Sequence, residues 1–311
     1  MKVGIVTVVT NEKNNLEAFY NSLSDQTFKN FTLYFVDNNS SDSSVEFFKT
    51  LNKNNQLNAK YIELNSNAGF AAGTNNGAEA AINESCNYLY IVNNDVVSDQ
   101  NCLLKLSELI LNDKEIVCAG LLLFKHKERF LGEIQEFGGE IDFKKGKLKK
   151  YYEGENINNL KLPPVIETDF VSGGACFIKS DVFKQIGMYE ESYFGYFDEI
   201  DFSYRLKVIN NYKMAAVSSA IAYHNHDWSK KKKNAYYFEY YLSERNKYLF
   251  FRKYRMYSSL LRALFMDLLK FPWRLLWFKR VCDFKLGFYY LKGLFHGLLN
   301  IKGKPKLKFV K

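Results

Sequence analysis

Tyr88-Leu-Tyr-Ile-Val92, followed directly by Asn93-Asn94-Asp95, is the most informative part of the chain. An apolar strand that ends in two amides and a carboxylate puts oxygen atoms at the carboxyl edge of a sheet. Open α/β sheets bind their ligands at that edge, and a hard divalent cation prefers oxygen ligands. The stretch therefore predicts an α/β sheet with a metal site at the end of this strand.

Strand and helix patterns alternate on both sides of this stretch. Short apolar runs, typical of strands buried on both faces, are separated by polar-faced segments of helix length. This βαβ alternation predicts a mostly parallel, doubly wound sheet that is flanked by helices. The expected strands are Val3–Val9, Phe31–Val36, Ala59–Leu64, Tyr88–Val92, Ile116–Phe124 and Met214–Tyr223, and the expected helices are Asn14–Ser24, Ser43–Leu51, Thr74–Asn83, Asn101–Leu111 and Asp198–Asn210.

Residues 126–165 interrupt this alternation. They are charged and irregular, and Gly138-Gly139 and Gly146 suggest hairpins. We expect this segment to be weakly ordered.

Charge divides the chain of 311 residues into two parts near Trp228. Residues 229–311 contain 21 Lys or Arg and 4 Asp or Glu, whereas residues 1–228 contain 22 and 30. The length fits one large α/β domain, alone or with an appendage. Five scattered cysteines without CxxC spacing predict reduced thiols in a cytoplasmic protein. Residues 1–6 are too short and too quickly polar for a signal peptide.

Two common phosphate-binding loops are absent from the sequence. Thr10-Asn11-Glu12-Lys13 follows the first expected strand in place of GxGxxG, and no GxxxxGK[ST] motif occurs. NAD and P-loop chemistry are therefore disfavoured, and a nucleotide-binding sheet of another kind is expected.

Six polar and glycine-rich motifs follow one another along the chain. They are Thr7-Val-Val-Thr-Asn-Glu12, Val36-Asp-Asn-Asn-Ser-Ser-Asp42, Asn67-Ala-Gly-Phe-Ala-Ala-Gly-Thr-Asn75, Asn93-Asn-Asp95, Ser172-Gly-Gly-Ala175 and Phe194-Gly-Tyr-Phe-Asp-Glu-Ile-Asp-Phe202. Their order and spacing resemble those of family 2 glycosyltransferases of the GT-A fold. Among these enzymes, the chain is most similar to the branch with bacterial rhamnosyltransferases and galactofuranosyltransferases. The resemblance covers roughly residues 1–250 and implies a nucleotide-diphosphate sugar donor, a divalent metal and inversion at the anomeric carbon.

The resemblance also implies a division of the chain. Residues 1–228 would form the GT-A catalytic domain, a Rossmann-like sheet with a nucleotide-binding half at about 1–125 and an acceptor half at about 126–228. Residues 229–311 would follow as a basic, aromatic, helical C-terminal extension.

Asp37 is the candidate for recognition of the nucleoside. Its carboxylate could cap the following turn, or it could accept a hydrogen bond from the N3–H group of uracil or thymine. The resemblance places Thr10, Glu12 and Asp37 near the base and ribose. It adds further candidate contacts to the nucleotide, namely Asn39, Asn67, Asn75, Asn94 and Arg245, although Arg245 could equally serve packing.

Asn93, Asp95 and His224 are the candidate metal ligands, the histidine on resemblance. The usual Asp-x-Asp motif here begins with Asn93, whose amide oxygen can bind Mg²⁺ or Mn²⁺ but contributes no charge. Asp95 is therefore expected to be the stronger ligand, and imidazole ligation favours Mn²⁺ over Mg²⁺.

Asp198-Glu199-Ile200-Asp201 is the candidate for the catalytic base. Carboxylates at the start of a helix are also explained by the helix dipole alone. Three acids within four positions nevertheless repel one another, which raises the pKa of at least one of them toward that of a useful base. The resemblance gives the role to Glu199, with Asp198 as the alternative because the two acids are swapped relative to the family pattern.

The C-terminal extension contains no run of about 18 uncharged apolar residues, so a spanning helix is not expected. Between Met256 and Phe278, basic residues fall on one side of a helical wheel and leucines on the other, with Pro272 expected to bend or break the helix. This pattern favours a helix lying on an anionic membrane surface. A lid or a homodimer contact is the alternative, and nucleic-acid binding is disfavoured.

The sequence as a whole predicts a metal-dependent inverting hexosyl- or rhamnosyltransferase. It would move a sugar from a UDP- or dTDP-sugar to a glycan or lipid-linked glycan in cell-surface polysaccharide synthesis, at the inner face of the cytoplasmic membrane. The alternative is a non-catalytic protein of the same fold that binds nucleotide sugars or acts as a scaffold.

Overall fold

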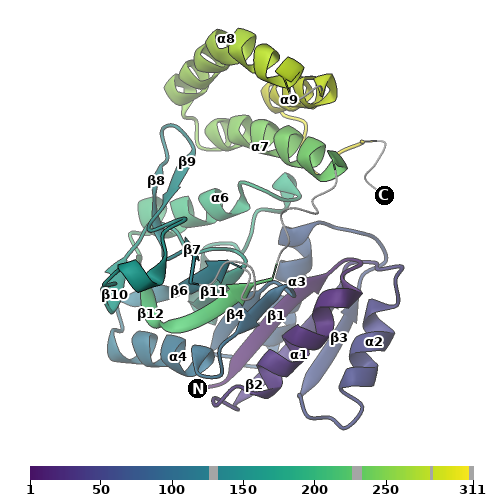
Figure 1. Ribbon diagram of the computed structural model, residues 1–311, viewed down its shortest axis with the longest axis vertical. Helices are drawn as coiled ribbons and strands as arrows, with labels where there is room; N and C mark the ends of the chain where they lie inside the picture. Colours follow the sequence, from purple (N-terminus) through teal and green to yellow (C-terminus); the bar gives the residue numbers. More distant parts are fainter. Residues whose placement is uncertain (126–131, 226–232, 281–282, 308–311) are drawn as a thin grey trace.

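A ten-stranded sheet with helices on both faces forms the body of the protein, and a layer of three helices covers one end (Figure 1). The computed structural model describes residues 1–125, 132–225, 233–280 and 283–307. The strands of the large sheet are β1 (Val3–Val9), β2 (Phe31–Asp37), β3 (Ala59–Glu63), β4 (Tyr88–Val92), β5 (Val96–Ser98), β6 (Ile116–Lys125), β7 (Ile134–Glu136), β10 (Val165–Glu167), β11 (Ala175–Lys179) and β12 (Lys213–His224).

The strand order along the main path of the sheet is β10-β12-β6-β11-β4-β1-β2-β3, with β5 paired to β12 and β7 to β6. β3, β2, β1 and β4 are parallel neighbours, as are β6 and β12. β11 is antiparallel to both β4 and β6, so all six of these strands run in one direction. The predicted mostly parallel α/β sheet is therefore confirmed, with an antiparallel strand inserted at its centre.

Helix α3 (Phe70–Asn83) packs closely on the sheet because small residues face it. Added Cβ atoms would come within 2.7 Å of the Val8 side chain at Gly73 and within 2.6 Å of the Val6 side chain at Gly77. The four-residue spacing of these glycines thus serves helix–sheet packing. The helices of the body are α1 (Leu16–Ser24), α2 (Ser44–Leu51), α3 (Phe70–Asn83), α4 (Cys102–Asn112), α5 (Ser180–Gln185) and α6 (Asp198–Tyr204).

The charged segment before β10 is better organised than its sequence suggests. Beyond β7, it forms a two-stranded hairpin of β8 (Gly139–Asp142) and β9 (Lys147–Lys150), as its glycines predict. Of this segment, residues 126–131 lie outside the described residues. The expectation of weak order was wrong for the hairpin, because an antiparallel partner supplies the hydrogen bonds that periodicity alone did not reveal.

The C-terminal extension folds back onto the body. It consists of α7 (Lys233–Lys253), α8 (Tyr257–Arg280) and α9 (Phe284–Leu298), with α7 lying closest to α6 (Figure 1). Pro272 was predicted to bend or break the helix, and α8 continues through it without a break. In the described part of the chain, no helix is both long and apolar enough to cross a membrane.

Candidate active site

The end of β4 lies against a glycine turn that precedes β11. Because β11 is antiparallel to β4, Ala175 pairs with Val92, and the turn at Ser172–Gly174 reaches the carboxyl edge of the sheet. The Asn93 backbone N–H donates a hydrogen bond to the Gly174 carbonyl over 2.9 Å. Asn94, which is buried, and Asp95 follow directly, so the strand-end motif and the turn form one wall of the site.

Asp95 and His224 come together at this edge although 129 positions separate them in the chain. β5 pairs with β12, which sets Val96 opposite His224. The Asp95 Oδ1 and His224 Nε2 atoms are 3.2 Å apart. Two ligands that each lie about 2.1 Å from an octahedral ion are roughly 3 Å from each other, so this pair fits a shared divalent ion.

Gln135 orients the imidazole of His224. Its side-chain amide lies 2.9 Å from the His224 Nδ1 atom, which leaves Nε2 toward Asp95. A histidine that binds a metal is usually held at its other nitrogen in this way. Among the described residues, no group of three or more His, Cys, Asp or Glu side chains is placed to hold a metal. A full ligand set therefore needs oxygens beyond this pair, such as the Asn93 amide and the donor diphosphate.

Glu199 lies across the same glycine turn from the strand-end motif. Its Oε1 atom accepts a hydrogen bond from the Gly173 N–H over 2.7 Å, and its side chain is half-buried. Burial raises the pKa of Glu199, while the Lys150 ammonium and the Gly173 N–H oppose that rise. Burial and the Glu199 charge likewise raise the pKa of Asp198, which is almost fully enclosed. Glu199 is thus the more accessible of the two acids.

Glu136 and Lys150 lie beside these two acids and complete a cluster of charged side chains. Neither residue was predicted from the sequence. The Lys150 Nζ atom lies 3.3 Å from Glu136 Oε2, and the Ser172 N–H donates to Glu136 Oε1 over 3.1 Å. Burial raises the pKa of Glu136 to about 7, against the opposing charge of Lys150. Gln135 and Glu136 are neighbours on β7, and the two-residue repeat of a strand points their side chains to opposite faces.

The loops after β1 and β2 are joined by hydrogen bonds. The Asn11 N–H donates to Ser40 Oγ over 3.0 Å, and the Lys13 N–H donates to Asp42 Oδ2 over 3.1 Å. This junction brings together the loops that carry Thr10, Glu12, Asp37 and Asn39.

Asp37 caps the turn after β2, which is one of the two roles predicted for it. Both of its carboxylate oxygens lie 3.1 Å from the Ser40 N–H, which donates to them. A carboxylate accepts about four hydrogen bonds in total. The turn therefore leaves acceptor capacity on Asp37 for a further donor.

Asn38 and Asn67 connect this loop to the start of α3. The Asn38 Nδ2 atom donates to Asn67 Oδ1 over 3.1 Å, and the Ala68 N–H donates to Asn38 Oδ1 over 2.8 Å. Gly69 has φ +90°, and a Cβ atom there would lie 2.3 Å from the Phe194 carbonyl oxygen. Only glycine fits this close approach between α3 and the turn before α6.

Two predicted nucleotide contacts are directed elsewhere by the structure. Asn75 is buried, and its amide bonds to the Tyr189 backbone and to Glu191. Arg245 is fully buried, and its guanidinium donates to the carbonyls of Tyr193 and Gly303. Their amide and guanidinium donors are used within the protein, so neither residue joins the group at the sheet edge.

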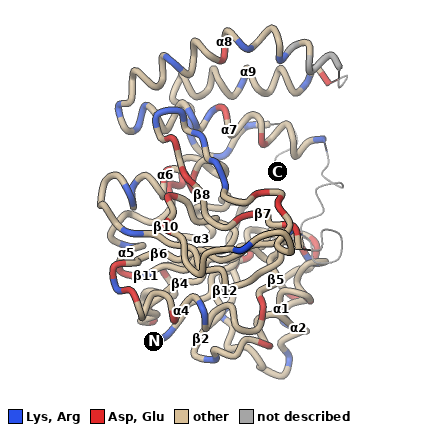
Figure 2. Tube along the Cα trace, turned by 60° about the vertical axis from the view of Figure 1, so that its left-hand side comes forward, with Lys and Arg blue, Asp and Glu red and all other residues tan. Residues whose placement is uncertain are grey.

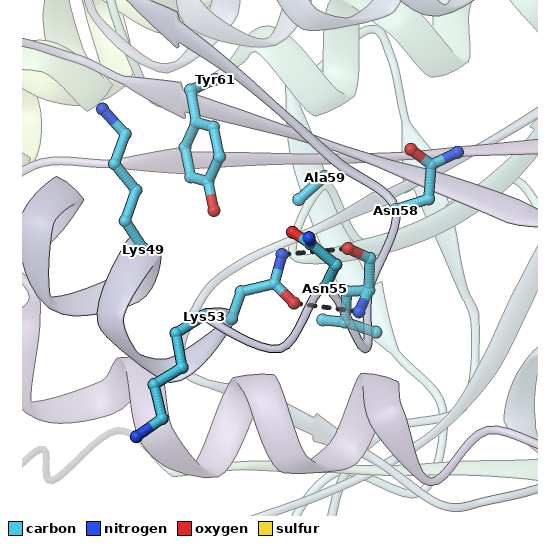
Figure 3. A pocket seen from close by; sticks show the side chains of 8 residues that line it. Lys49, Lys53, Asn55, Asn58, Ala59 and Tyr61 are labelled. Atoms are coloured by element: carbon cyan, nitrogen blue, oxygen red, sulfur yellow. Dashed lines mark hydrogen bonds between the residues drawn. The ribbon is translucent and has the colours of Figure 1, made fainter.

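A separate hollow of about 460 Å³ lies between α2 and β3 (Figure 3). Lys49, Lys53 and Tyr61 line it, and Asn52 below it is bonded to the Leu57 backbone. Ala59, another lining residue, begins β3, whereas Asp37 pairs with Glu63 at the other end of that strand. The hollow therefore opens at the opposite edge of the sheet from the candidate site.

The sheet order, the flanking helices and the polar strand ends at one edge together define a GT-A fold. A family model described as glycosyl transferase family 2 matches residues 4–187. The chain belongs to glycosyl transferase family 2. No curated protein matches it in a sequence comparison.

Solved structures of similar fold include glycosyltransferases bound to nucleotides. GalNAc-T7 with UDP, GalNAc and Mn²⁺ has a TM-score of 0.60 at 15% identity, covering 80% of this chain and 51% of its own. TarS 1–349 from S. aureus with UDP-GlcNAc has a TM-score of 0.58 at 14% identity, with coverage of 97% and 82%. The mannosyltransferase PcManGT from Pyrobaculum calidifontis with GDP-Man and Mn²⁺ has a TM-score of 0.58 at 12% identity, with coverage of 96% and 87%. The chain thus spans about half the length of GalNAc-T7.

Proposed function

We propose that the protein is an inverting glycosyltransferase that uses a UDP- or dTDP-sugar. One observation carries this proposal: a single glycine turn joins the candidate metal ligands to the candidate base. Gly174 accepts a hydrogen bond from Asn93, and Gly173 donates one to Glu199. A donor diphosphate beside Asp95 would therefore have its anomeric carbon within reach of an acceptor that Glu199 activates.

Asp95, His224 and the Asn93 amide would hold a divalent ion, for which the histidine favours Mn²⁺ over Mg²⁺. When bound, the ion would serve as a Lewis acid toward the donor diphosphate. Asp95 is the only carboxylate of this set, so it supplies the protein's share of the charge balance. Gln135 holds His224 in the orientation that directs Nε2 to the site.

Glu199 would act as the general base. Its carboxylate takes the proton of an acceptor hydroxyl while the acceptor oxygen forms a bond to the anomeric carbon. The bond between that carbon and the diphosphate breaks on the opposite face, and its electron pair leaves with the nucleotide. No covalent enzyme intermediate is needed, and the configuration inverts. Asp198 is the second candidate for this role, although it is more deeply buried.

Asp37 would select the nucleobase. Its carboxylate retains acceptor capacity beside the Ser40 N–H and would receive the N3–H of uracil or thymine. Cytosine has an acceptor at that position and would be repelled. Thr10, Glu12, Asn39, Asn67 and Asn94 would surround the same nucleotide from the neighbouring loops.

A transfer assay tests this function directly. Thermal-shift screening of nucleotide sugars with and without Mn²⁺ would first identify the donor, with dTDP-rhamnose and UDP-hexoses as leading candidates from the rhamnosyl- and galactofuranosyltransferase-like branch. Transfer or slow hydrolysis of that donor is the expected result. Donor binding without any turnover would instead support a non-catalytic binding or scaffold protein.

The C-terminal helices carry an outer apolar face, which we propose docks on an anionic membrane. Large apolar side chains recur within each helix, mostly at spacings of three or four residues, and are highly exposed, up to 74% for Trp273. Large exposed apolar patches mark interaction sites. This outer apolar face comprises Leu261, Phe265, Leu268, Leu269, Trp273 and Leu276 on α8, and Phe284 and Phe288 on α9.

The inner side of α8 includes a buried ionic cluster, which supports this proposal. Asp267 is buried between α7 and α8, where it bonds to Lys247 over 2.7 Å and to the Tyr248 hydroxyl over 2.8 Å. Arg274 lies 3.7 Å from the same carboxylate group. Asp267 and Arg274 therefore lie on the inner side of α8, whereas Arg262 and Lys270 are exposed together with the outer apolar face. Lys and Arg also recur along α8 and α9 (Figure 2), in a segment with 21 basic and 4 acidic residues.

The full chain should sediment with anionic liposomes at low salt and bind neutral liposomes much less. Each Lys or Arg near an anionic leaflet contributes about 1 kcal/mol, and the effect falls off within a Debye length. Replacing Phe265 and Trp273 by Gln should reduce sedimentation by about tenfold, because less apolar surface is inserted.

Leu111→Gln with Ile209→Gln is the matched control, since these apolar side chains are also exposed, to 54% and 55%, but lie outside the extension. Equal loss of liposome binding in both double variants would contradict the proposed face. The face is instead a dimer contact if the wild type dimerises without binding liposomes and the double variant Phe265→Gln with Trp273→Gln is monomeric. A polymeric or lipid-linked glycan acceptor at the membrane would suit such docking and a role in cell-surface polysaccharide synthesis.

A further inference from the structure

The turn before α6 has an unusual backbone. Phe194, Tyr196 and Phe197 have φ values of 68°, 60° and 71°. Bulky residues rarely adopt positive φ, and three of them within four positions require stabilising contacts from their surroundings. The catalytic candidates Asp198 and Glu199 follow this turn directly, so its shape sets where they lie.

Asn246 of α7 supplies such contacts. Its side chain is fully buried, and its Nδ2 atom is directed at three carbonyl oxygens of the turn. The distances are 3.1 Å to Tyr193, 2.8 Å to Gly195 and 2.9 Å to Tyr196. One amide therefore holds the backbone on both sides of Phe194.

Arg245 fixes the position of Asn246 and adds a further bond to the turn. Its Nε atom donates to Asn246 Oδ1 over 2.9 Å, which orients the amide with its nitrogen toward the turn. Its Nη2 and Nη1 atoms donate over 2.7 Å to the carbonyls of Tyr193 and Gly303. The Gly303 N–H in turn donates to the Ser192 carbonyl over 2.7 Å. The C-terminal segment thus closes around the turn.

The other side of the turn contacts the start of α3. The Phe70 N–H donates to the Phe194 carbonyl over 3.2 Å, beside Gly69. The turn therefore connects three parts of the molecule: the acids of α6, the loop that carries Asn67, and α7 of the extension.

We propose that Arg245 and Asn246 are positioning residues that hold this turn in the conformation in which Glu199 faces the donor. They would act on the reaction through the backbone and would touch neither substrate. This inference rests on the proposed transferase function, and it gives the C-terminal extension a part in the catalytic step that is separate from membrane docking.

Asn246→Asp tests the proposal with little change in size. The carboxylate keeps an acceptor for Arg245 Nε but replaces the amide donor, so it would face three carbonyl oxygens with negative charge. We expect kcat to fall by about 10²-fold, as a misplacement of roughly 1 Å can cause. The Kd of the donor nucleotide should stay within roughly threefold, because the loops after β1 and β2 are unchanged. Asn246→Ser keeps one hydroxyl donor, so its kcat should lie between those of Asn246→Asp and the wild type. It replaces Asn246→Asp in the test if that variant does not fold.

Tyr248→Phe is the matched control on the same helix. It removes a buried hydrogen bond to Asp267 that lies on the α8 side, away from the turn. It should lower the melting temperature without lowering kcat. If Asn246→Asp keeps the wild-type kcat, or if kcat in both variants falls only in proportion to lost stability, the pair serves packing alone and the proposal is overturned.

Hydrogen exchange separates this proposal from the proposed function. Backbone amides of residues 194–199 should exchange faster in Asn246→Asp than in the wild type. In Tyr248→Phe, the exchange rates of these amides should equal those of the wild type. That result would support the positioning role of Asn246 in the turn even if the wild type transferred no sugar. Absence of sugar transfer by the wild type would contradict the transferase function, not the positioning role. Unchanged exchange in Asn246→Asp would overturn the positioning role itself.

Discussion

Glu199→Gln should lower turnover by about 10²–10⁴-fold while donor affinity is retained. Glutamine has the same length, and its carbonyl oxygen can still accept the hydrogen bond that Gly173 donates to Glu199. It cannot take a proton from an acceptor hydroxyl at neutral pH. The measurement is kcat over a range of acceptor concentrations, together with the Kd of UDP or dTDP.

Asp198→Asn distinguishes the two acids. Asparagine removes the charge that Asp198 places beside Glu199 but leaves the Glu199 carboxylate in place, so it should alter turnover far less than Glu199→Gln. Near-normal turnover in Glu199→Gln combined with a large loss in Asp198→Asn would transfer the role of base to Asp198.

The pH profile provides a second check on the base. The pKa of Glu199 is raised by burial, so activity should be lost as the pH falls through a value above that of an ordinary glutamate. Lys150 holds this pKa down, and Lys150→Met should therefore move the acidic limb of the profile to higher pH. Lys149→Met is the control, because Lys149 lies on the same strand but is exposed and paired with Glu140. An acidic limb that shifts equally in both variants would contradict the assignment.

Asp95→Asn should abolish most of the Mn²⁺-dependent part of donor binding. The substitution keeps the size of the side chain and removes the only charged ligand of the proposed set. Losing even an outer-shell partner of a metal costs about 10- to 100-fold in affinity, so loss of the charged ligand should cost more. With a chelator present, wild type and variant should bind UDP or dTDP equally weakly. Calorimetric titration with and without Mn²⁺ measures the difference.

Asp99→Asn is the matched control for Asp95→Asn. Asp99 directly follows β5, and its carboxylate accepts a hydrogen bond from the Asn101 N–H at the start of α4. Removing the Asp99 carboxylate should leave the Mn²⁺ dependence of donor binding unchanged. If a chelator leaves wild-type turnover intact, the metal assignment is wrong, and a cationic side chain must balance the diphosphate. Lys150 would then be the better candidate, since the guanidinium of Arg245 is buried among backbone carbonyls.

The sequence predicted the sheet and one edge of it well, for a simple physical reason. Strands that run in the same direction end at the same edge, so polar residues at their carboxyl ends must gather there. Asp37 and Asp95, on or just after parallel strands, and His224, which ends β12, could therefore be assigned to one edge from periodicity and resemblance. Whether they bind nucleotide and metal stays a prediction.

The same reasoning could not find Gln135, Glu136 and Lys150. They lie in a charged segment whose short strands have little apolar alternation, and their partners are distant in the chain. The only local signal was Ile134-Gln135-Glu136 before two glycines, which is too short to predict a strand. Antiparallel pairing with β6 and the turn at β8–β9 bring these side chains to Glu199 and His224.

The C-terminal extension shows which features follow from helical periodicity and which depend on packing. The helical period of α8 determined which residues share a face, with leucines on one side and ionic residues on the other. It did not determine which face is buried, because that depends on the partner. α7 offers Lys247 and Tyr248 to Asp267, so this carboxylate turns inward, while Leu261, Leu268 and Leu269 remain exposed. Likewise, the sequence supplied Arg245 and Asn246, but only packing against the turn before α6 directed them to backbone carbonyls rather than to a diphosphate.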